Sequence, residues 1–281
     1  MKTGRIKILS VLVFACVILC YNQYHEYSDN KISRENKFVG VKKAIVIGAS
    51  SGIGKAVAQE LAAHGYEVGL TGRRVELLEA VKNGLPTKGY VKQMDLRDVT
   101  SSIRQLHELI LEMGGLDLFV FNAAIGASDR TSSWEEQKAL LDVNVIGFSA
   151  MTRVATDYFM QKKSGHIVGI SSILALRGIV HSYTYSASKA FMSNYLDGLR
   201  DTFQVRDVSV CVTDIMPGFV DTDMTRNVKN KFWEASPEQA AQQIYHAIES
   251  KRTHVYVTKR WRLIAWFVRY APDWLFVKIW K

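Results

Sequence analysis

The chain has 281 residues, 48% of them hydrophobic, which suits one α/β domain with a sizeable core and short additions at both ends. Its net charge of +9 lies mostly at those ends: residues 1–40 carry six Lys and Arg against three acids, and residues 259–281 carry six against one. The body between them is left with a net charge of +1 and no basic stripe, so nucleic acid is not an expected partner. The three cysteines form neither a disulfide framework nor a metal-ligand spacing, so no metal site is expected.

The first 27 residues are predicted to contact a membrane. Three cations in Met1–Lys7 precede Ile8–Tyr21, a stretch of fourteen residues without a charge. A spanning helix needs at least about 17 residues, so three interpretations stay open: an uncleaved signal-anchor, a cleaved signal peptide, and a buried or interfacial helix. The positive charges place the extreme N-terminus in the cytoplasm. Residues 28–40 are expected to form a polar linker.

Seven apolar segments alternate with helical patterns between residues 41 and 258. The expected strands are Ala44–Ile47, Glu67–Thr71, Tyr90–Met94, Leu116–Phe121, His166–Ser171, Val208–Ile215 and His254–Val257. The first six are rich in Val, Ile and Phe, as are strands of a parallel sheet that is buried on both faces. Ser236, Pro237 and Gln239 form a capping-box pattern with proline in the first turn, which marks the start of a helix. We therefore expect a single doubly wound Rossmann-type α/β domain over residues 41–258, with a central parallel sheet of about seven strands.

A glycine-rich turn follows the first expected strand. Gly48, Gly52 and Gly54 stand between the apolar run Ala44–Ile47 and an amphipathic helical pattern. Strand, glycine turn and helix are the context of a dinucleotide site, because glycine lets the backbone approach the pyrophosphate and the helix N-terminus offers free N–H groups. The spacing G-x-x-x-G-x-G differs from the commoner G-x-G-x-x-G, and an ordinary glycine-rich βα turn is the alternative.

The charge after the second expected strand favours NADP(H) over NAD(H). NAD-selective sites place an acidic residue there for the ribose hydroxyls, whereas an arginine accommodates the 2′-phosphate of NADP. In the segment Thr71–Arg74, Gly72 provides no carboxylate and Arg73 provides the cation. A surface arginine without a ligand is the alternative.

Tyr185 and Lys189 are separated by one helical turn, so their side chains share a helix face. A free tyrosine titrates near ~10, which is too high for proton exchange with a substrate at neutral pH. A neighbouring ammonium stabilises the phenolate, so we expect Lys189 to lower the pKa of Tyr185 into the working range. On its own this spacing is a weak signal, and a solvated helix face is the alternative.

Together these features resemble the short-chain dehydrogenase/reductase family, and the resemblance covers roughly Val41–Lys259. The three glycines fall on the family's glycine motif, although Ile47 replaces its usual threonine. Asn122 and Ala123 keep the centre of the family's Asn-Asn-Ala-Gly motif, while the residues at 121 and 124 depart from it.

Three further motifs follow in the family's order. Asn144 matches the helix asparagine that the family uses to hold a relay water, with a purely structural helix residue as the alternative. Ser172 lies thirteen residues before Tyr185, which is the family's interval. Pro217–Thr222 matches the Pro-Gly motif and the threonine that follows it beside the nicotinamide.

The resemblance implies a full set of site residues. The implied catalytic residues are Asn144, Ser172, Tyr185 and Lys189, and the implied substrate-binding residues are Ser172, Tyr185 and Phe219. The implied cofactor contacts are Gly48, Ser50, Ser51, Gly52, Ile53, Gly54, Arg73, Arg74, Asp95, Leu96, Asn122, Ala123, Tyr185, Lys189, Pro217, Gly218, Val220 and Thr222. Among these, Asp95 and Leu96 would contact the adenine.

The expected function is an NADP(H)-dependent oxidoreductase that interconverts a carbonyl and an alcohol by hydride transfer. Tyr185 would protonate the developing alkoxide, Ser172 would donate a hydrogen bond to the same oxygen, and Lys189 would also bond the nicotinamide ribose. The expected substrate lining, Ile173–Val180 and a lid near Asp223–Ala235, is mostly apolar and favours a lipophilic substrate. The alternatives are a non-catalytic NADP-binding membrane-associated scaffold or sensor, and an epimerase or dehydratase of the extended branch, which usually has a longer chain.

Residues 259–281 are predicted to form a basic, Trp-rich amphipathic tail in a membrane interface. They hold four of the six tryptophans, and Pro272 divides them into two short segments. Trp with Lys and Arg at headgroup level is typical of an in-plane helix, whereas a tail that covers a groove on its own domain or on a partner subunit is the alternative. The expected partners are membrane lipid and a lipophilic carbonyl or alcohol, with a homodimer left open. We expect the catalytic domain in a compartment that contains NADP(H): at the cytoplasmic face if the N-terminal segment does not span, with a lumen that contains the cofactor as the alternative.

Overall fold

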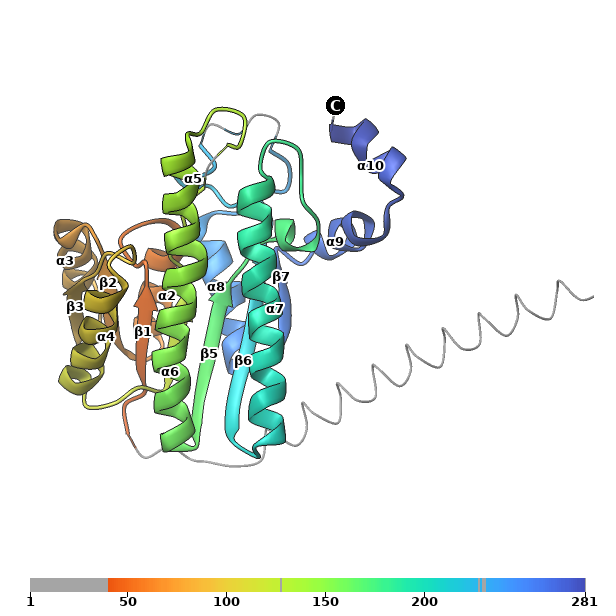
Figure 1. Cartoon of the computed structure of the whole chain (residues 1–281). Coiled ribbons are helices and arrows are strands. Elements are labelled where there is room, and N and C mark those ends of the chain that lie inside the picture. The colour runs from red at the N-terminus through yellow and green to blue at the C-terminus, as the bar shows by residue number, and fades with distance from the viewer. Residues whose placement is uncertain (1–39, 127, 227, 229–230, 281) are drawn as a thin grey trace, which may run out of the picture. The chain divides into compact units, whose positions relative to one another are not determined.

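Seven parallel strands form the central sheet, in the spatial order β3-β2-β1-β4-β5-β6-β7 (Figure 1). Their bounds are β1 (Lys43–Ile47), β2 (Glu67–Gly72), β3 (Gly89–Gln93), β4 (Leu118–Phe121), β5 (Ser164–Ile170), β6 (Ser209–Pro217) and β7 (His254–Val257). The predicted Rossmann-type sheet is confirmed, and the ends of the expected strands shift by no more than two residues.

The computed structural model describes residues 40–126, 128–226, 228 and 231–280. The predicted anchor over residues 1–27 and, apart from Gly40, the predicted linker over residues 28–40 lie outside the described residues. The compact unit that holds the sheet begins at Gly40 and includes the Trp-rich tail.

Helices cover both faces of the sheet (Figure 1). One face packs against α2 (Gly52–Ala63), α3 (Val75–Asn83) and α8 (Pro237–Glu249), and the other against α4 (Val99–Met113), α6 (Phe148–Lys162) and α7 (Tyr183–Val205). Because both faces are covered, β1 and β4 are almost entirely apolar and buried. The predicted capping box is present at the start of α8, where Ser236 Oγ accepts from Gln239 N and the Gln239 side chain accepts from Ser236 N.

The strands β2 and β4 lie on either side of β1 in the sheet. The chain passes from β1 outward to β2 and β3 and then crosses back to β4 on the other side of β1, so the strand order reverses direction there. In doubly wound folds, ligands bind in the crevice outside the carboxyl ends of the strands at such a switch point. Gly48 follows β1 and Asn122 follows β4, so the topology places the glycine turn and the asparagine motif at this crevice.

Five short helices remain in the described part of the chain, and the last two of them form the C-terminal tail. They are α5 (Trp134–Leu141), the π-helix η1 (Asp142–Gly147), the 3₁₀ helix η2 (Ile173–Leu176), α9 (Trp261–Tyr270) and α10 (Asp273–Trp280). The predicted division of the tail by Pro272 is confirmed, because α9 ends at Tyr270 and α10 begins at Asp273. Within the part of the chain that the structure describes, no helix combines the length and the apolar character needed to cross a bilayer.

Candidate active site

The glycine turn after β1 packs directly against the end of β4. Gly48 has a positive φ of 87°, and a Cβ at this position would lie 2.7 Å from the Ala123 Cα. A Cβ at Gly54 would lie 2.1 Å from the Gly48 carbonyl oxygen and 2.4 Å from Asn122 Nδ2. Side chains are therefore excluded at both positions by the close packing of the glycine turn on itself and on the residues that follow β4.

Asn122 joins the end of β4 to the glycine turn. Its Nδ2 donates to the Gly48 carbonyl oxygen at 2.9 Å, and its backbone N–H donates to the Ile47 carbonyl oxygen at 3.0 Å. The departures from the family motif on either side do not prevent this contact. Phe121 is fully buried and meets the Phe148 ring edge-on, with the ring centroids 5.1 Å apart.

Two arginines stand beside the turn, in different positions. The Arg74 guanidinium donates to Ser50 Oγ at 2.9 Å and to Ser51 Oγ at 2.7 Å, so it lies across the glycine turn. Ser51 is the N-cap residue of α2, yet its side chain meets Arg74 and not the helix N–H groups. Arg73, the cation singled out from the sequence, is exposed at the rim. The bonds of Arg74 to the turn depend on tertiary geometry, and nothing in the sequence distinguishes the two arginines.

Asp95 lies after β3, on the side of the site where the adenine was expected. Its carboxylate accepts from Arg97 Nε at 3.0 Å and from Arg97 N at 3.1 Å. The hydrogen bond with the Arg97 side chain holds the pKa of Asp95 below its ordinary value. The Asp95 side chain is thereby held in an ionised state at the cavity.

Ser172 and Tyr185 come together from two elements. Ser172 follows β5 and is the N-cap of η2, where its Oγ accepts from Leu174 N at 3.1 Å. Tyr185 lies in the first turn of α7, where the Ser172 side chain acts to lower the pKa of its phenol. A serine hydroxyl and a phenol hydroxyl therefore face the same space, where one carbonyl oxygen could accept from both.

Lys189 lies one turn further along α7 and is 2% exposed. Its Nζ donates to the Ile170 carbonyl oxygen at 2.8 Å and lies 5.7 Å from the centroid of the Tyr185 ring. Burial lowers the pKa of Lys189 to about 8, and the nearby charge of Asp214 opposes this shift.

The predicted direction of the Tyr185 pKa is wrong in this structure. Burial raises the pKa of Tyr185 to about 12, and only the hydrogen bond with Ser172 acts in the opposite direction. The physical reason is that the Lys189 ammonium is bonded to the Ile170 carbonyl and not to the phenol, so the loss of hydration dominates. Tyr185 is therefore a protonated phenol at neutral pH.

Asn144 is fully buried in η1. Its Oδ1 accepts from Ile125 N at 2.8 Å, and its Nδ2 donates to the Ile125 carbonyl oxygen at 2.9 Å and to Ser188 Oγ at 3.1 Å. The amide thus ties the segment after β4 to α7. This geometry favours the structural alternative for the side chain, while the relay-water role stays a prediction.

These segments surround a cavity of about 440 Å³. Every predicted cofactor residue except Gly54 lines it, as does Ser172, whereas Asn144 and Phe219 do not. Phe219 packs edge-on against the Trp261 ring, with the centroids 5.5 Å apart, and so belongs to an aromatic cluster beside the cavity. The cavity is also lined by residues that the sequence did not single out. They lie at the ends of strands or next to the motifs: Met94, Ala124, Ile125, Val143, Ile170 and Ser171.

The cavity fits a nicotinamide dinucleotide. At one end it has the glycine turn at the α2 N-terminus, with the Ser50 and Ser51 hydroxyls and two arginines, and at the other end the Ser172, Tyr185 and Lys189 donors. Among the described residues, no group of three or more His, Cys, Asp or Glu is placed to hold a metal ion. Fold and site together define a Rossmann-type oxidoreductase.

The chain belongs to the short-chain dehydrogenase/reductase family. The family model described as short chain dehydrogenase matches residues 42–232. An uncharacterized oxidoreductase of Myxococcus xanthus is 35% identical over 189 residues, which are 66% of this chain and 74% of that protein. The NADP-dependent 3-hydroxy acid dehydrogenase YdfG of Escherichia coli is 30% identical over 201 residues, 70% of this chain and 80% of that protein.

Solved structures agree on the fold. A short-chain dehydrogenase/reductase of Burkholderia phymatum in complex with NAD has a TM-score of 0.75 at 19% identity, over 81% of this chain and 92% of that one. The names of the relatives thus include both NADP and NAD, and the protein is an oxidoreductase with a nicotinamide cofactor whose preference they do not decide.

We expect burial of Lys189 to make stability depend on pH. Its pKa is about 8 in the folded protein, whereas an unfolded lysine titrates near ~10.4. Between these values the unfolded chain binds more protons, so the free energy of unfolding rises with pH. Lys189→Met removes this dependence, and the stability of the wild type relative to the variant should rise by up to about 3 kcal/mol between about pH 7 and pH 10.5.

Urea unfolding of both proteins at the two pH values measures this difference. Lys138→Met is the matched control, because the Lys138 side chain is exposed on α5. If the difference in unfolding free energy between the wild type and Lys189→Met is the same at both pH values, burial does not lower the pKa of Lys189.

Proposed function

We propose that the protein is an NADP(H)-dependent oxidoreductase that interconverts a carbonyl and an alcohol on a lipophilic substrate, with Tyr185 as general acid and base. The observation that carries this proposal is the meeting of Ser172, Tyr185 and Lys189 in the same cavity as the glycine turn. A scaffold that only binds the cofactor has no need of these three side chains together. NADPH, when bound, would supply the hydride.

In this proposal the substrate oxygen accepts hydrogen bonds from Ser172 and Tyr185. As negative charge develops on that oxygen, Tyr185 transfers its phenol proton to it and Ser172 stabilises the charge. The Lys189 Nζ lies 5.7 Å from the ring centroid, so its positive charge favours the phenolate that remains through space, although its hydrogen bond goes to the Ile170 carbonyl oxygen. Burial raises the pKa of Tyr185 to about 12, so at neutral pH the phenol is protonated and carries the proton that this step transfers.

The lipophilic substrate is inferred from the apolar side chains beside Ser172. The 3₁₀ helix η2 presents Ile173, Leu174 and Leu176 to the C-terminal segment, and Phe219 and Phe232 meet there edge-on at 5.8 Å. None of these five side chains lines the cavity itself, so the inference rests on their position beside it, where they offer few polar partners to a hydrophilic substrate.

The test of this function is a screen of the purified full chain, in detergent or vesicles, with NADPH against lipophilic ketones and aldehydes. We expect NADPH consumption with at least one compound and formation of the alcohol. Tight NADPH binding without turnover of any carbonyl would favour the scaffold or sensor instead.

The preference for NADP(H) is inferred from Arg73 and Arg74. Reversal of either charge should weaken NADPH binding while NADH is less affected, because only NADPH has a 2′-phosphate to repel. Loss of a charge-assisted contact of about 1.5–3 kcal/mol would change the preference roughly tenfold to a hundredfold. Because Arg74 bonds the turn, Arg74→Glu should have the larger effect.

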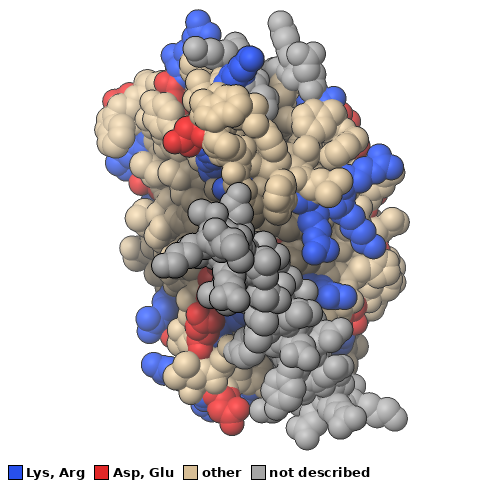
Figure 2. Space-filling model, turned by 90° about the vertical axis from the view of Figure 1, so that its right-hand side faces the viewer, with Lys and Arg blue, Asp and Glu red and all other residues tan. Residues whose placement is uncertain are grey.

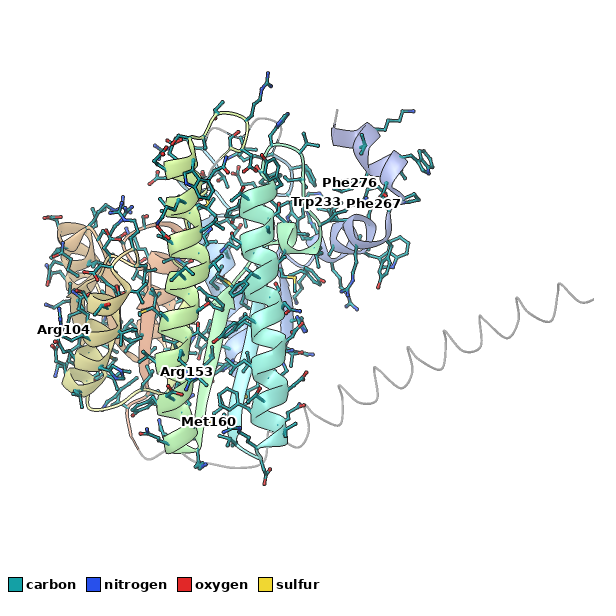
Figure 3. All side chains as sticks on the ribbon, in the orientation of Figure 1. Arg104, Arg153, Met160, Trp233, Phe267 and Phe276 are labelled. Atoms are coloured by element: carbon teal, nitrogen blue, oxygen red, sulfur yellow. The ribbon has the colours of Figure 1, made fainter. Side chains whose placement is uncertain are left out.

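Fluorescence titration of Arg73→Glu and Arg74→Glu with NADPH and NADH measures this preference. The matched control is Arg104→Glu, which makes the same charge change on α4, away from the cavity (Figure 3). If the NADPH/NADH ratio of dissociation constants is unchanged in both variants, the basis for the NADP preference is lost.

A further inference from the structure

The helix α9 has two apolar faces, and only one of them is packed. Trp261, Ala265 and Val268, which are spaced at about one helical turn, are buried against the domain. Leu263, Trp266 and Tyr270 lie on the opposite side, with 71%, 68% and 63% of their surface exposed. The segment predicted as a membrane-interfacial tail therefore covers its own domain with one face and leaves the other free.

The same division continues in α10. Phe276 is buried, with the Arg177 guanidinium 4.0 Å from its ring centroid. Arg177 also donates to the Ala271 carbonyl oxygen at 2.7 Å and forms an ion pair with Asp273. These contacts attach α10 to the segment after η2, while Trp274 remains 71% exposed. Leu263, Trp266, Tyr270 and Trp274 are called the outer face below.

Cations lie beside the outer face, along one flank of α9 and toward both ends of the tail. Five exposed Lys and Arg accompany it: Lys259, Arg260, Arg262, Arg269 and Lys278. Arg262 and Arg269 are seven residues apart, so they lie along one flank of α9, between its packed face and the outer face. The single acid among residues 259–281, Asp273, is paired with Arg177. Figure 2 views the side of the domain toward the tail, where Lys and Arg lie among uncharged side chains.

This combination fits an anionic bilayer better than a protein. Exposed Trp and Tyr at headgroup level, with Lys and Arg along the helix flank, match the chemistry of a bilayer interface, and anionic lipids add attraction for each cation. A second copy of the chain would bring the same five cations together, and their repulsion disfavours that contact.

The packed face connects this surface to the active site. The Trp261 ring lies on the backbone of Gly218, where a Cβ would be 2.0 Å from Trp261 Cε2. The same ring stacks on Phe232 of the lid segment at 5.0 Å and meets Trp233 edge-on at 6.3 Å. Trp233, Phe267 and Phe276 all lie at the same end of the domain (Figure 3). The helix α9, with the Trp261 ring on its packed face, thus lies between the outer face and the Pro-Gly segment and lid.

We propose that the outer face of α9 and α10 docks on the surface of an anionic lipid bilayer, and that the lipophilic substrate reaches the cavity from this bilayer past Phe232 and Trp233. The proposed docking surface does not depend on the proposed function, whereas the proposed substrate route rests on it.

The docking is tested with the full chain in vesicles that carry brominated acyl chains, which quench tryptophan fluorescence. All six tryptophans lie at or after Trp134, so quenching reports on the domain and the tail and not on the N-terminal residues. We expect stronger quenching in vesicles with phosphatidylglycerol than in vesicles of phosphatidylcholine alone, decreasing with salt. The double variant Trp266→Phe/Trp274→Phe should lose most of the quenchable fluorescence.

Leu111→Trp is the matched control, because Leu111 is 79% exposed on α4, away from the tail. Its added fluorescence should escape quenching. If Trp266 and Trp274 also escape quenching in anionic vesicles, the docking surface is refuted. Sedimentation of the full chain in detergent then tests a dimer as the alternative occupant of the outer face. A wild type that sediments as a dimer, with a Trp266→Glu/Trp274→Glu variant that sediments as a monomer, would show that a second copy of the chain covers this face.

The substrate route is tested with a ketone from the screen that partitions into vesicles. Trp266→Glu/Trp274→Glu should raise KM for this ketone in anionic vesicles severalfold and leave kcat and KM for a short, water-soluble ketone unchanged. An unchanged KM in vesicles would overturn the route even if the quenching stands. Absence of turnover with every carbonyl, with quenching intact, would instead count against the proposed function.

Discussion

Tyr185→Phe is expected to bind NADPH about as tightly as the wild type and to lose about 10²–10⁴-fold in kcat on a ketone that the wild type reduces. The substitution removes one hydroxyl and keeps the ring on which Lys189 lies. Binding and catalysis should therefore separate, since the proton donor is lost and the shape of the cavity is kept. Fluorescence titration and single-turnover kinetics measure the two quantities independently.

Tyr183→Phe is the matched control for this change. Tyr183 begins the same helix two residues earlier and is exposed outside the cavity. Its kcat should stay within error of the wild type. Retention of most turnover by Tyr185→Phe would mean that another group supplies the proton, and the proposed mechanism would fail.

Gly54→Ala should destabilise the protein and abolish tight NADPH binding. The added Cβ would lie 2.1 Å from a backbone oxygen and 2.4 Å from Asn122 Nδ2, and no rotamer change moves it away. The glycine turn would have to move away from the end of β4, which disrupts the cofactor site. Overpacking of this kind typically costs about 1–3 kcal/mol, which urea unfolding detects, and NADPH titration detects the loss of binding.

Gly198→Ala is the control for the same chemical change. Gly198 is exposed in α7, and a Cβ there would meet no heavy atom within 4 Å apart from its chain neighbours and the backbone of its own helix. Alanine should stabilise this helix by about 0.5–1 kcal/mol. If Gly54→Ala unfolds at the same urea concentration as the wild type and binds NADPH normally, then the turn tolerates a side chain and its glycine serves another purpose.

The positions of the site residues along the chain could be predicted because they depend on local patterns. An apolar run followed by glycines and an amphipathic helix specifies a strand, a turn and a helix without reference to the rest of the molecule. The interval between Ser172 and Tyr185 is also a property of the sequence. Parallel strands then bring these distant segments to one edge of the sheet, where they line one cavity.

The electrostatics of the site could not be predicted in the same way. The helical spacing correctly placed Lys189 beside Tyr185, but the bond of its ammonium to Ile170 and the burial of the phenol reversed the expected pKa direction. Likewise, two adjacent arginines look equivalent in sequence, and only the fold directs Arg74 to the serines of the turn. Charges act through space and through lost hydration, which a linear pattern does not contain.

The sequence by itself determined the order of strands and helices, the glycine turn, and the amphipathic, cationic character of the tail. Only the tertiary structure decided which face of that tail is packed. Trp261 and Trp266 are the same residue type five positions apart, yet the first is 4% exposed on Gly218 and the second 68% exposed. Periodicity shows that a helix has faces, but which of two apolar faces meets the domain depends on the shape opposite: here a glycine leaves room for an indole ring, and Arg177 holds the next helix in place.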